Sequence, residues 1–406
     1  MRAQRCLGNF KPLLYTSKSL LFTRKSHKVA SMETTKTLLV LGTRPQIIKS
    51  APLIHLAKKD SDIDMQIVHT GQHYDYEMSK EFFDELKLPD PIVDLNVGSG
   101  THAWQTGKMM IRLEKALIKE TPDLVVVPGD TNSTLAGALA AAKLHVPVAH
   151  IEAGARSYNM RMPEEINRRL TDHCSTLLFA PTKNCANNLL REGINQKNVH
   201  LVGDTMYDSL LRHLPKAMKE KVLGRLNLKP GGYAVLTAHR PENVDSPKRL
   251  RKIIDAMTKL EELVIVFPVH PRTRRRLKEA NLQKRIDKEG NPRLIKPVEY
   301  HEMLNLIKKA KLVFTDSGGM QKEAFWLHTP CVTLRDETEW TETVDLGANV
   351  LVGADPKRIL TETKRVLRDK GMKRRLKDKI NPFGDGKAAE KILSTIKEFG
   401  SRSLKR

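Results

Sequence analysis

Aromatic residues and cysteines are scarce in this chain, and long apolar runs are missing. Of its 406 residues, 5% are aromatic and four are cysteines. No apolar run approaches the roughly 18 residues that a membrane span needs. The cysteines show no CxxC pair and no spacing typical of a metal site; they are Cys6, Cys174, Cys185 and Cys331. Free thiols are typical of a reducing compartment, so we expect a cytoplasmic protein with no metal site and no membrane partner.

Two common nucleotide-binding signatures are also absent. The sequence contains neither a GxGxxG dinucleotide fingerprint nor a Walker P-loop. This argues against NAD and ATP sites, and we expect no cofactor.

Acidic residues are missing from the first 32 positions. Residues 1–32 contain no Asp or Glu and seven Lys or Arg. That composition resembles an organellar transit peptide, whereas the lack of a continuous apolar stretch argues against a secretory signal. A true start at Met32 is the alternative. We assign 1–34 to a basic leader outside the fold, and expect a chain beginning at Met32 to keep its activity and stability.

The formal net charge of +23 would attract polyanions nonspecifically. The basic runs Arg272–Arg276 and Lys373–Lys379 lie on predicted helices and lack interleaved aromatic residues. We therefore expect no specific nucleic-acid partner. A noncatalytic basic binding protein remains one alternative.

Short apolar runs alternate with helical stretches along the chain, which predicts parallel sheets covered on both faces. A polar stretch, Pro215–Gly232, separates two such series. The first series of predicted strands is Thr37–Leu41, Met65–His69, Val93–Leu95, Leu124–Val127, Val146–Ile151, Thr176–Ala180 and Val199–Val202. The second is Tyr233–Thr237, Leu263–Pro268, Leu294–Lys296, Leu312–Thr315, Cys331–Leu334 and Val350–Val352.

This pattern predicts an α/β protein with two Rossmann-like domains facing one another across a cleft. We place the first at 35–210 and the second at 211–384. An NPFGDG break precedes a closing helix, 385–399, which we assign to the first domain.

Three acidic residues fall where a parallel sheet presents side chains to a ligand. Asp130 and Glu152 follow predicted strands, and Glu164 follows Pro163 at a predicted helix start. Each alone could be a helix cap or a favourable charge at a helix N-terminus. Together they suggest proton transfer in one cleft.

Cations and glycine turns at the same strand ends suggest a diphosphate site. In GTRPQIIK, Arg44 and Lys49 lie in a strand-to-helix turn and the helix that follows. Later turns add two histidines, a Ser-Gly-Gly sequence and an acid placed to accept from ribose hydroxyls; these are His239, His270, Ser317, Gly318, Gly319 and Glu323.

From about Thr37 to Ile396 the chain resembles the non-hydrolysing UDP-N-acetylglucosamine 2-epimerases. The resemblance rests on many motifs in one order: GTRPQIIKSAP, HTGQHYD, GDTNST, HIEAGARS, MPEEINRRLTDH, TAHRPEN, PVHP, DSGGMQKEA, TLRDETEW and NPFGDGKAAEKI. It implies the GT-B fold, a homodimer, and UDP held mainly by the second domain.

The resemblance also implies roles for individual residues. Asp130, Glu152 and Glu164 match the family's essential carboxylates. The nucleotide-binding positions match Arg44, Lys49, His239, Ser317, Gly318, Gly319 and Glu323, with uracil near Val298–Met303. Trp340 departs from the family, since many bacterial members have an Arg there.

The sugar C2–H is not adjacent to a carbonyl, so elimination of UDP to a glycal followed by readdition is the expected route, without metal or NAD. Carboxylates would act as acid and base on opposite faces of the ring. A GT-B glycosyltransferase is an alternative, but would not exchange the C2 proton.

Two substrates fit the family. UDP-N-acetylglucosamine is the expected one. UDP-2,3-diacetamido-2,3-dideoxyglucuronate is the alternative, suggested by Gln46 after GTRP, by HYD after TGQ, by the stretch Gly98–His102 and by the LRDETEW run. Glu at position 46 would add negative charge near Arg44 and Lys49, so Gln suits an acidic sugar.

Overall fold

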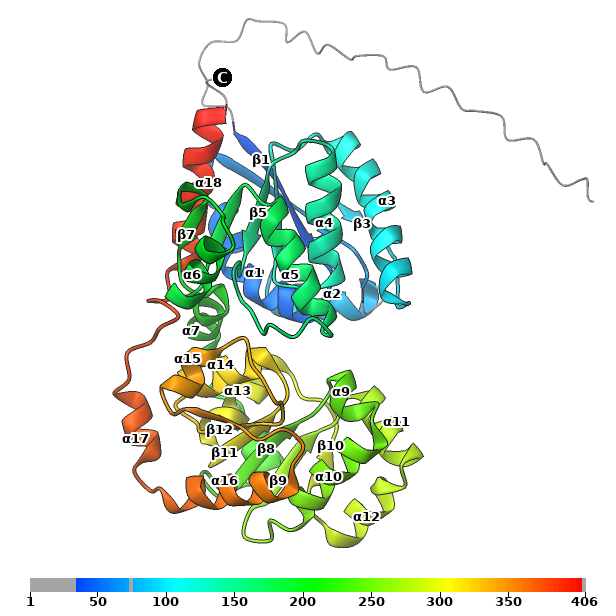
Figure 1. The fold of residues 1–406 in the computed structure, drawn as a ribbon, viewed down its shortest axis with the longest axis vertical. Coiled ribbons are helices and arrows are strands. Elements are labelled where there is room, and N and C mark those ends of the chain that lie inside the picture. Colours follow the sequence, from blue (N-terminus) through cyan, green and yellow to red (C-terminus); the bar gives the residue numbers. More distant parts are fainter. Residues whose placement is uncertain (1–33, 73–75, 404–406) are drawn as a thin grey trace, which may run out of the picture. The chain divides into compact units, whose positions relative to one another are not determined.

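Two parallel sheets organise this computed structural model, which describes residues 34–72 and 76–403 (Figure 1). The strands of the first sheet lie in the order β3-β2-β1-β4-β5-β6-β7. Their bounds are β1 Thr35–Leu41, β2 Ile63–His69, β3 Val93–Asp94, β4 Leu124–Pro128, β5 Val148–Ile151, β6 Leu177–Ala180 and β7 Val199–Leu201.

The second sheet repeats this plan, with its strands in the order β10-β9-β8-β11-β12-β13. Their bounds are β8 Tyr233–Thr237, β9 Val264–Pro268, β10 Arg293–Ile295, β11 Leu312–Thr315, β12 Cys331–Thr333 and β13 Asn349–Leu351. Two doubly wound parallel sheets are the arrangement of the GT-B fold, so the predicted fold class is confirmed.

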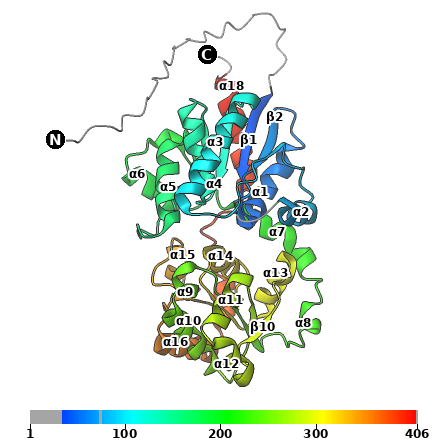
Figure 2. The same ribbon diagram turned by 90° about the vertical axis from the view of Figure 1, so that its right-hand side faces the viewer.

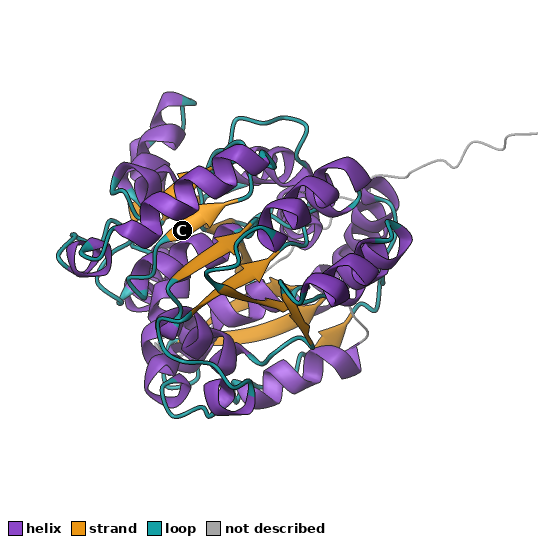
Figure 3. Cartoon of the chain, turned by 90° about the horizontal axis from the view of Figure 1, so that it is seen from below, coloured by secondary structure: helices purple, strands orange, loops and turns teal. Residues whose placement is uncertain are grey.

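Helices cover the faces of both sheets, as Figure 3 shows with strands in orange and helices in purple. In the first half they are α1 Arg44–Ala57, α2 Tyr76–Glu85, α3 His102–Glu120, α4 Asn132–Lys143, α5 Pro163–Cys174, α6 Lys183–Arg191, the short 3-10 helix Gln196–Asn198, and α7 Thr205–Ala217. The rest are α8 Val222–Arg225, α9 Pro241–Val244, α10 Pro247–Thr258, α11 Pro271–Glu279, α12 Leu282–Glu289, α13 Tyr300–Lys309, α14 Gly318–Trp326, α15 Thr341–Asp345, α16 Pro356–Arg368, α17 Met372–Lys377 and α18 Ala388–Ser403.

The central strands are apolar on both faces because helices bury both faces. Every residue of β4 and of β8 is buried. This explains why continuous apolar runs predicted the strands. The separating stretch was predicted less well, because α7 continues through Pro215 to Ala217. Leu210 and Ala217 are both buried, so packing maintains the helix past the proline.

The closing helix α18 returns to the first sheet, as predicted. It packs against α1, α7 and β1, and Figure 2 shows it behind β1. Lys397 near its end pairs with Asp60 at 2.9 Å and with Asp62 at 2.8 Å. The loop before α18 is fixed as well, since the Asp204 backbone N–H donates to the Phe383 carbonyl at 2.9 Å.

Each sheet has one point where the strand order reverses. In the first sheet it lies between β1 and β4, and in the second between β8 and β11. Ligands of open α/β sheets bind at such switch points, outside the carboxyl ends of the strands. The predicted basic leader, 1–34, lies outside the described residues apart from Thr34.

Within residues 34–72 and 76–403, no helix is both long enough and apolar enough to cross a membrane.

Candidate functional site

The β1–α1 and β4–α4 loops meet at the first switch point, where Gly42 allows close packing. A Cβ on Gly42 would lie 2.0 Å from Thr70 Oγ1 and 2.1 Å from Ser133 Oγ. These hydroxyls are buried and hydrogen-bond to each other at 2.7 Å. Only glycine fits here, and the turn places the next residues, Thr43 and Arg44, at the start of α1.

The Gln46 side chain forms hydrogen bonds with both of these loops. Its side-chain oxygen accepts from the Gly42 N–H at 2.9 Å. Its side-chain amide donates to the Pro128 carbonyl at 2.8 Å and to Thr134 Oγ1 at 3.0 Å. The side chain is buried and fully used by the protein. Its position in the fold therefore accounts for a glutamine here without reference to an acidic sugar.

Asp130 lies in the loop after β4 and pairs with Arg168 of α5 at 2.8 Å. It is not the cap of α4, because that role belongs to the Thr131 side chain. Burial raises the pKa of Asp130; the charge of Arg168 opposes this rise, and the carboxylates of Glu164 and Glu152 add to it. Asp130 is thus the carboxyl whose surroundings favour holding a proton.

Glu152 follows β5 in the opposite electrostatic environment. Its carboxylate lies 2.5 Å from Lys49 Nζ and 3.6 Å from Lys322 Nζ. Burial works to raise the pKa, but the ammonium groups of Lys322 and Lys49 outweigh it and lower the pKa to about 2. Its backbone φ of 74° is a left-handed conformation that costs energy for a non-glycine residue. Glu152 is held ionised.

Glu164 lies in the first turn of α5. Its charge acts on Asp130, on Arg168 and on Arg240 at the start of α9. The three predicted acids therefore share one electrostatic cluster, and Arg240 brings to it a cation from the second half of the chain.

Arg240 belongs to a further ion-pair group around Glu339. The Glu339 carboxylate lies 2.9 Å from Arg335 and 3.6 Å from Arg240. Burial works to raise the pKa of Glu339, but Arg335, Arg240 and Arg168 hold it far below its usual range. A Cβ on Gly318 would lie 2.3 Å from Glu339 Oε1, so this carboxylate rests against the N-terminus of α14.

Ser317, Gly318 and Gly319 form that N-terminus, as predicted. The Ser317 hydroxyl caps the helix by accepting from the Met320 N–H at 3.4 Å. Gly319 is also closely packed, because a Cβ there would lie 3.1 Å from Met206 Cε.

His239 stands beside this turn and is held by Asp316. The Asp316 carboxylate accepts from the backbone N–H of His239 and of Arg240 at 3.0–3.1 Å, and lies 3.3 Å from His239 Nδ1. Asp316 is fully buried, whereas the His239 side chain is 52% exposed. His270 lies close by; burial lowers its pKa, and the charges of His239 and Arg272 lower it further. His270 also caps α11, accepting from the Arg272 N–H at 3.3 Å.

Glu323 is buried on α14 near Tyr300 and Arg44. Burial raises its pKa to about 7, against the hydrogen bond from Tyr300 and the charge of Arg44. Arg44 itself stacks 4.4 Å from the centre of the Phe82 ring. The predicted uracil segment lies alongside, where Val298 and Met303 pack half-buried against the core.

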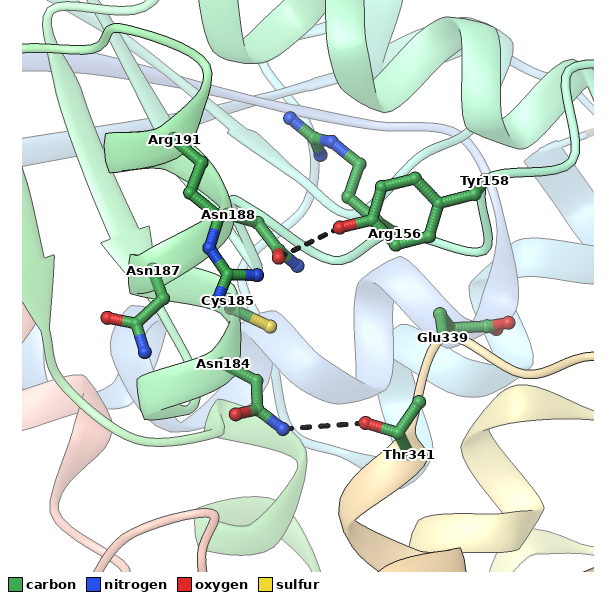
Figure 4. Close-up of a pocket in the computed structure, with 9 residues that line it drawn as sticks. All are labelled: Arg156, Tyr158, Asn184, Cys185, Asn187, Asn188, Arg191, Glu339 and Thr341. Atoms are coloured by element: carbon green, nitrogen blue, oxygen red, sulfur yellow. Dashed lines mark hydrogen bonds between the residues drawn. The ribbon is translucent and has the colours of Figure 1, made fainter.

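A pocket of about 270 Å³ opens next to Glu339 (Figure 4). Its polar wall comes from α6 and from the loop after β5: the Tyr158 hydroxyl donates to Asn188 at 3.0 Å, and Asn184 donates to Thr341 at 3.4 Å. None of the residues predicted from the sequence to form the site lines this pocket.

Several ionic partners of the predicted residues were also missed. Lys322 and Asp204 pair at 2.5 Å, and Lys322 lies 3.7 Å from the centre of the Trp340 ring. Trp340 is buried. At the position where many bacterial members of the family have an Arg, this chain therefore has a tryptophan whose ring contacts Lys322. Among these partners, Arg168 alone could have been predicted from the local sequence, since it follows Glu164 by four residues on one helix.

Among the residues that the structure describes, no cluster of three or more His, Cys, Asp or Glu side chains could hold a metal ion.

Comparisons with known proteins agree on one family. The UDP-N-acetylglucosamine 2-epimerase family model matches residues 55–397. A UDP-N-acetylglucosamine 2-epimerase from Methanocaldococcus jannaschii is 50% identical, over 89% of this chain and 98% of the relative. A crystal structure of the enzyme from that organism with UDP-GlcNAc and UDP superimposes with a TM-score of 0.83 at 49% identity, covering 89% of this chain and 99% of the other. A UDP-2,3-diacetamido-2,3-dideoxy-D-glucuronate 2-epimerase from Pseudomonas aeruginosa is 44% identical, over 89% of this chain and 99% of the relative.

Proposed function

Because the chain belongs to the UDP-N-acetylglucosamine 2-epimerase family, a family of isomerases, we propose that it interconverts UDP-N-acetylglucosamine and UDP-N-acetylmannosamine. One observation carries the proposal beyond family membership. Three acids predicted to be catalytic lie in one charged cluster, and the surroundings of Asp130 and Glu152 shift their pKa values in opposite directions. Such divergent environments are typical of carboxyl groups with different tasks in one reaction.

The proposed reaction begins with departure of UDP from C1. The C1–O bond breaks with its electrons going to the diphosphate, and the C2–H bond supplies the electrons of the new C1–C2 double bond as a carboxylate takes the proton. Protonation of C2 on the other face and readdition of UDP to C1 give the epimer. Substrate and product are isomers of the same oxidation state, so the reaction needs no oxidant or reductant.

We assign the leaving diphosphate to Arg44, His239 and the backbone N–H groups at the start of α14, Ser317 to Gly319. A helix N-terminus and nearby cations stabilise negative charge that develops on a leaving group. The close approach that Gly318 and Gly319 permit supports this assignment. The Glu339 carboxylate lies against the same helix end, so we expect this side chain to shift when a phosphate binds there.

We assign proton transfer at C2 to Asp130 and Glu164, one for each face of the sugar. Glu152 would stay ionised, and its negative charge would stabilise the positive charge that develops at C1 as UDP leaves. Lys49 then supports Glu152 rather than the phosphate, which revises its predicted role. His270, Val298, Met303 and Glu323 remain proposed contacts of the nucleotide.

The proposal is tested by incubating the protein with UDP-N-acetylglucosamine and following the 1H NMR spectrum. We expect UDP-N-acetylmannosamine to accumulate to an equilibrium that is also reached from the other side. Release of free N-acetylmannosamine, or transfer to an added acceptor without epimer, would instead indicate hydrolysis or a glycosyltransferase.

The uronate is the second candidate substrate, supported by the Pseudomonas aeruginosa relative. The physical argument from Gln46 no longer favours it, because that side chain is occupied by Gly42, Pro128 and Thr134. We therefore keep UDP-N-acetylglucosamine. A kcat/KM ratio of about 100-fold in favour of the uronate, roughly 2.7 kcal/mol in transition-state binding, would reverse this choice.

We also propose a homodimer. Trp104, Ile111 and Ile118 lie seven residues apart on α3 and are 48%, 61% and 61% exposed. On α5, Ile166 and Leu170 are also exposed. Both helices pack against α4 (Figure 1). Exposed apolar surface of this kind is typical of an interface, and a second copy of the chain is the proposed occupant.

The domain boundaries and the compartment stay proposals. Two domains, 35–210 with 385–399 and 211–384, correspond to the two sheets and to the return of α18. A cytoplasmic location is supported by the free thiols Cys174, Cys185 and Cys331.

A further inference from the structure

We propose that Lys322 is a positioning residue that joins the nucleotide-binding helix α14 to the reacting carboxylate Glu152, and that keeps this carboxylate charged. The inference rests on the proposed function, because Glu152 has a task only if the sugar is activated there. It goes further by assigning a role to a lysine that is not among the proposed contacts of the sugar or the nucleotide.

The geometry places Lys322 at the meeting of the two halves of the chain. It extends from α14, whose first turn is the proposed diphosphate site, and it is 1% exposed. Its ammonium lies 2.5 Å from Asp204 at the start of α7 and 3.6 Å from Glu152 at the end of β5. The Trp340 ring lies 3.7 Å from the ammonium on another side. Two acids and one aromatic face therefore fix the position of a single buried cation.

These contacts explain why a lysine is stable in a buried place. Burial favours the neutral amine, but Asp204 and Glu152 reverse this preference and raise the pKa of Lys322 above its usual range. The Trp340 face contributes a cation–π interaction, which is strongest away from water. These surroundings favour the charged form of Lys322.

The same charge contributes to the state of Glu152. Titratable groups on several neighbouring elements act on this carboxylate: Lys322 from α14, Lys49 from α1, Arg168 from α5, Asp130 from the β4–α4 loop, and the Cys185 thiol from α6. Lys49 is the closer cation at 2.5 Å, and Lys322 adds a second positive charge at 3.6 Å. Removing Lys322 should therefore raise the pKa of Glu152.

Lys322 also links binding to chemistry by its position on α14. Ser317, five residues earlier, caps the helix end that would receive the diphosphate, whereas the Lys322 ammonium lies 3.6 Å from Glu152. UDP binding at that helix end does not use the Lys322–Glu152 pair, whereas the proposed reaction of the sugar does. Loss of Lys322 is thus expected to lower kcat more than UDP affinity.

The first test is the pH dependence of kcat between about pH 5 and 9. We expect Lys322→Met to lower kcat at least ~10-fold at pH 7 and to add an acid limb at least one pH unit above any wild-type limb. UDP affinity should change less than ~3-fold, and Lys322→Arg should restore most of the wild-type profile.

Lys308→Met is the matched control, since Lys308 is half-buried on α13 and donates to the Leu327 carbonyl rather than to a carboxylate. A Lys322→Met profile that coincides with wild type overturns the proposal.

Lys322→Met leaves Asp204 buried without its cation and is therefore prone to unfold. The double variant Lys322→Met/Asp204→Asn removes both charges and is expected to show the same acid limb. If the double variant folds but its pH profile lacks the acid limb, the proposal is also overturned.

A second measurement needs no turnover, so it separates this inference from the proposed function. The stability loss caused by Lys322→Met/Asp204→Asn is measured in the wild-type and in the Glu152→Gln background, by denaturant unfolding at pH 7. We expect a clearly smaller loss when Glu152 is neutral, because the two side chains are coupled. Equal losses in both backgrounds contradict the pairing, whether or not the protein proves to be an epimerase.

Discussion

At the scale of single residues, the site contains carboxyl groups in contrasting surroundings. Lys49 and Lys322 flank Glu152, whereas Asp130 has one arginine partner and two acids near it. A group that must give up and take back a proton benefits from a pKa close to the working pH, and a group that stabilises positive charge benefits from a low one. The assignment of Asp130 to proton transfer and Glu152 to charge stabilisation follows from this contrast.

The acid variants test that assignment directly. Asp130→Asn and Glu164→Gln should each lower kcat at least ~10²-fold, the scale of lost acid–base catalysis. Glu152→Gln should lower kcat by a similar factor, through lost stabilisation of the positive charge at C1. UDP binding, measured by calorimetry, should persist in all three. His239→Ala should weaken both UDP binding and turnover. Near wild-type kcat in all three acid variants would mean that this cluster is not catalytic.

Glu323 predicts a pH-dependent stability. Its folded pKa of about 7 lies above the unfolded value of roughly 4.3. The stability that its protonated form contributes is complete below the unfolded pKa and is lost as pH rises through 7. Glu323→Gln should match wild type near pH 4 and exceed it above pH 7, by on the order of 1–3 kcal/mol. Denaturant midpoints at several pH values would measure this, and a constant difference across the range would contradict it.

At the scale of elements, the strands and most helices were predictable because burial on both faces leaves a plain pattern. The β4 run LVVVP and the β8 run YAVLT contain few polar residues, so their place in a sheet was clear from sequence. The rule that loops at strand ends face the ligand led to the prediction of Asp130, Glu152 and His239 as site residues.

The ionic partners could not be predicted by that rule. Lys322 and Glu152 are 170 positions apart, and Arg240 and Glu339 are 99 apart. No local pattern encodes which buried lysine meets which acid, since this depends on how the loops of both sheets approach one another. The role of Gln46 could not be predicted either, because two of its hydrogen bonds, to Pro128 and Thr134, reach partners more than 80 residues away.

The β1–α1 turn gives a prediction at this scale. Gly42→Ala would drive a methyl group into the buried pair Thr70–Ser133, and overpacking of this kind costs about 1–3 kcal/mol. Gly107→Ala on α3 is the matched control, because nothing lies within 4 Å of its added Cβ, and alanine favours a helix. Melting temperatures should fall for the first variant and rise slightly for the second. An unchanged melting temperature for Gly42→Ala would mean that the turn relaxes to accommodate the methyl group.

At the scale of the whole molecule, the proposed dimer can be separated from ordinary surface exposure. Ile111→Arg/Ile118→Arg should yield monomers in sedimentation velocity, because two buried charges would face the partner subunit. Ile380→Arg changes an isoleucine that is 88% exposed outside α3 and α5, so it should leave the mass unchanged. A dimer that survives the double substitution would place the interface elsewhere.

We propose that the molecule epimerises C2 by eliminating and re-adding UDP. Incubation with UDP-N-acetylglucosamine in D2O, followed by NMR, tests it most directly, because the C2 proton must leave the sugar in the glycal intermediate. We predict that the epimer formed carries deuterium at C2, and that the recovered substrate gains it with time. Formation of epimer that retains its original C2 proton would contradict the account.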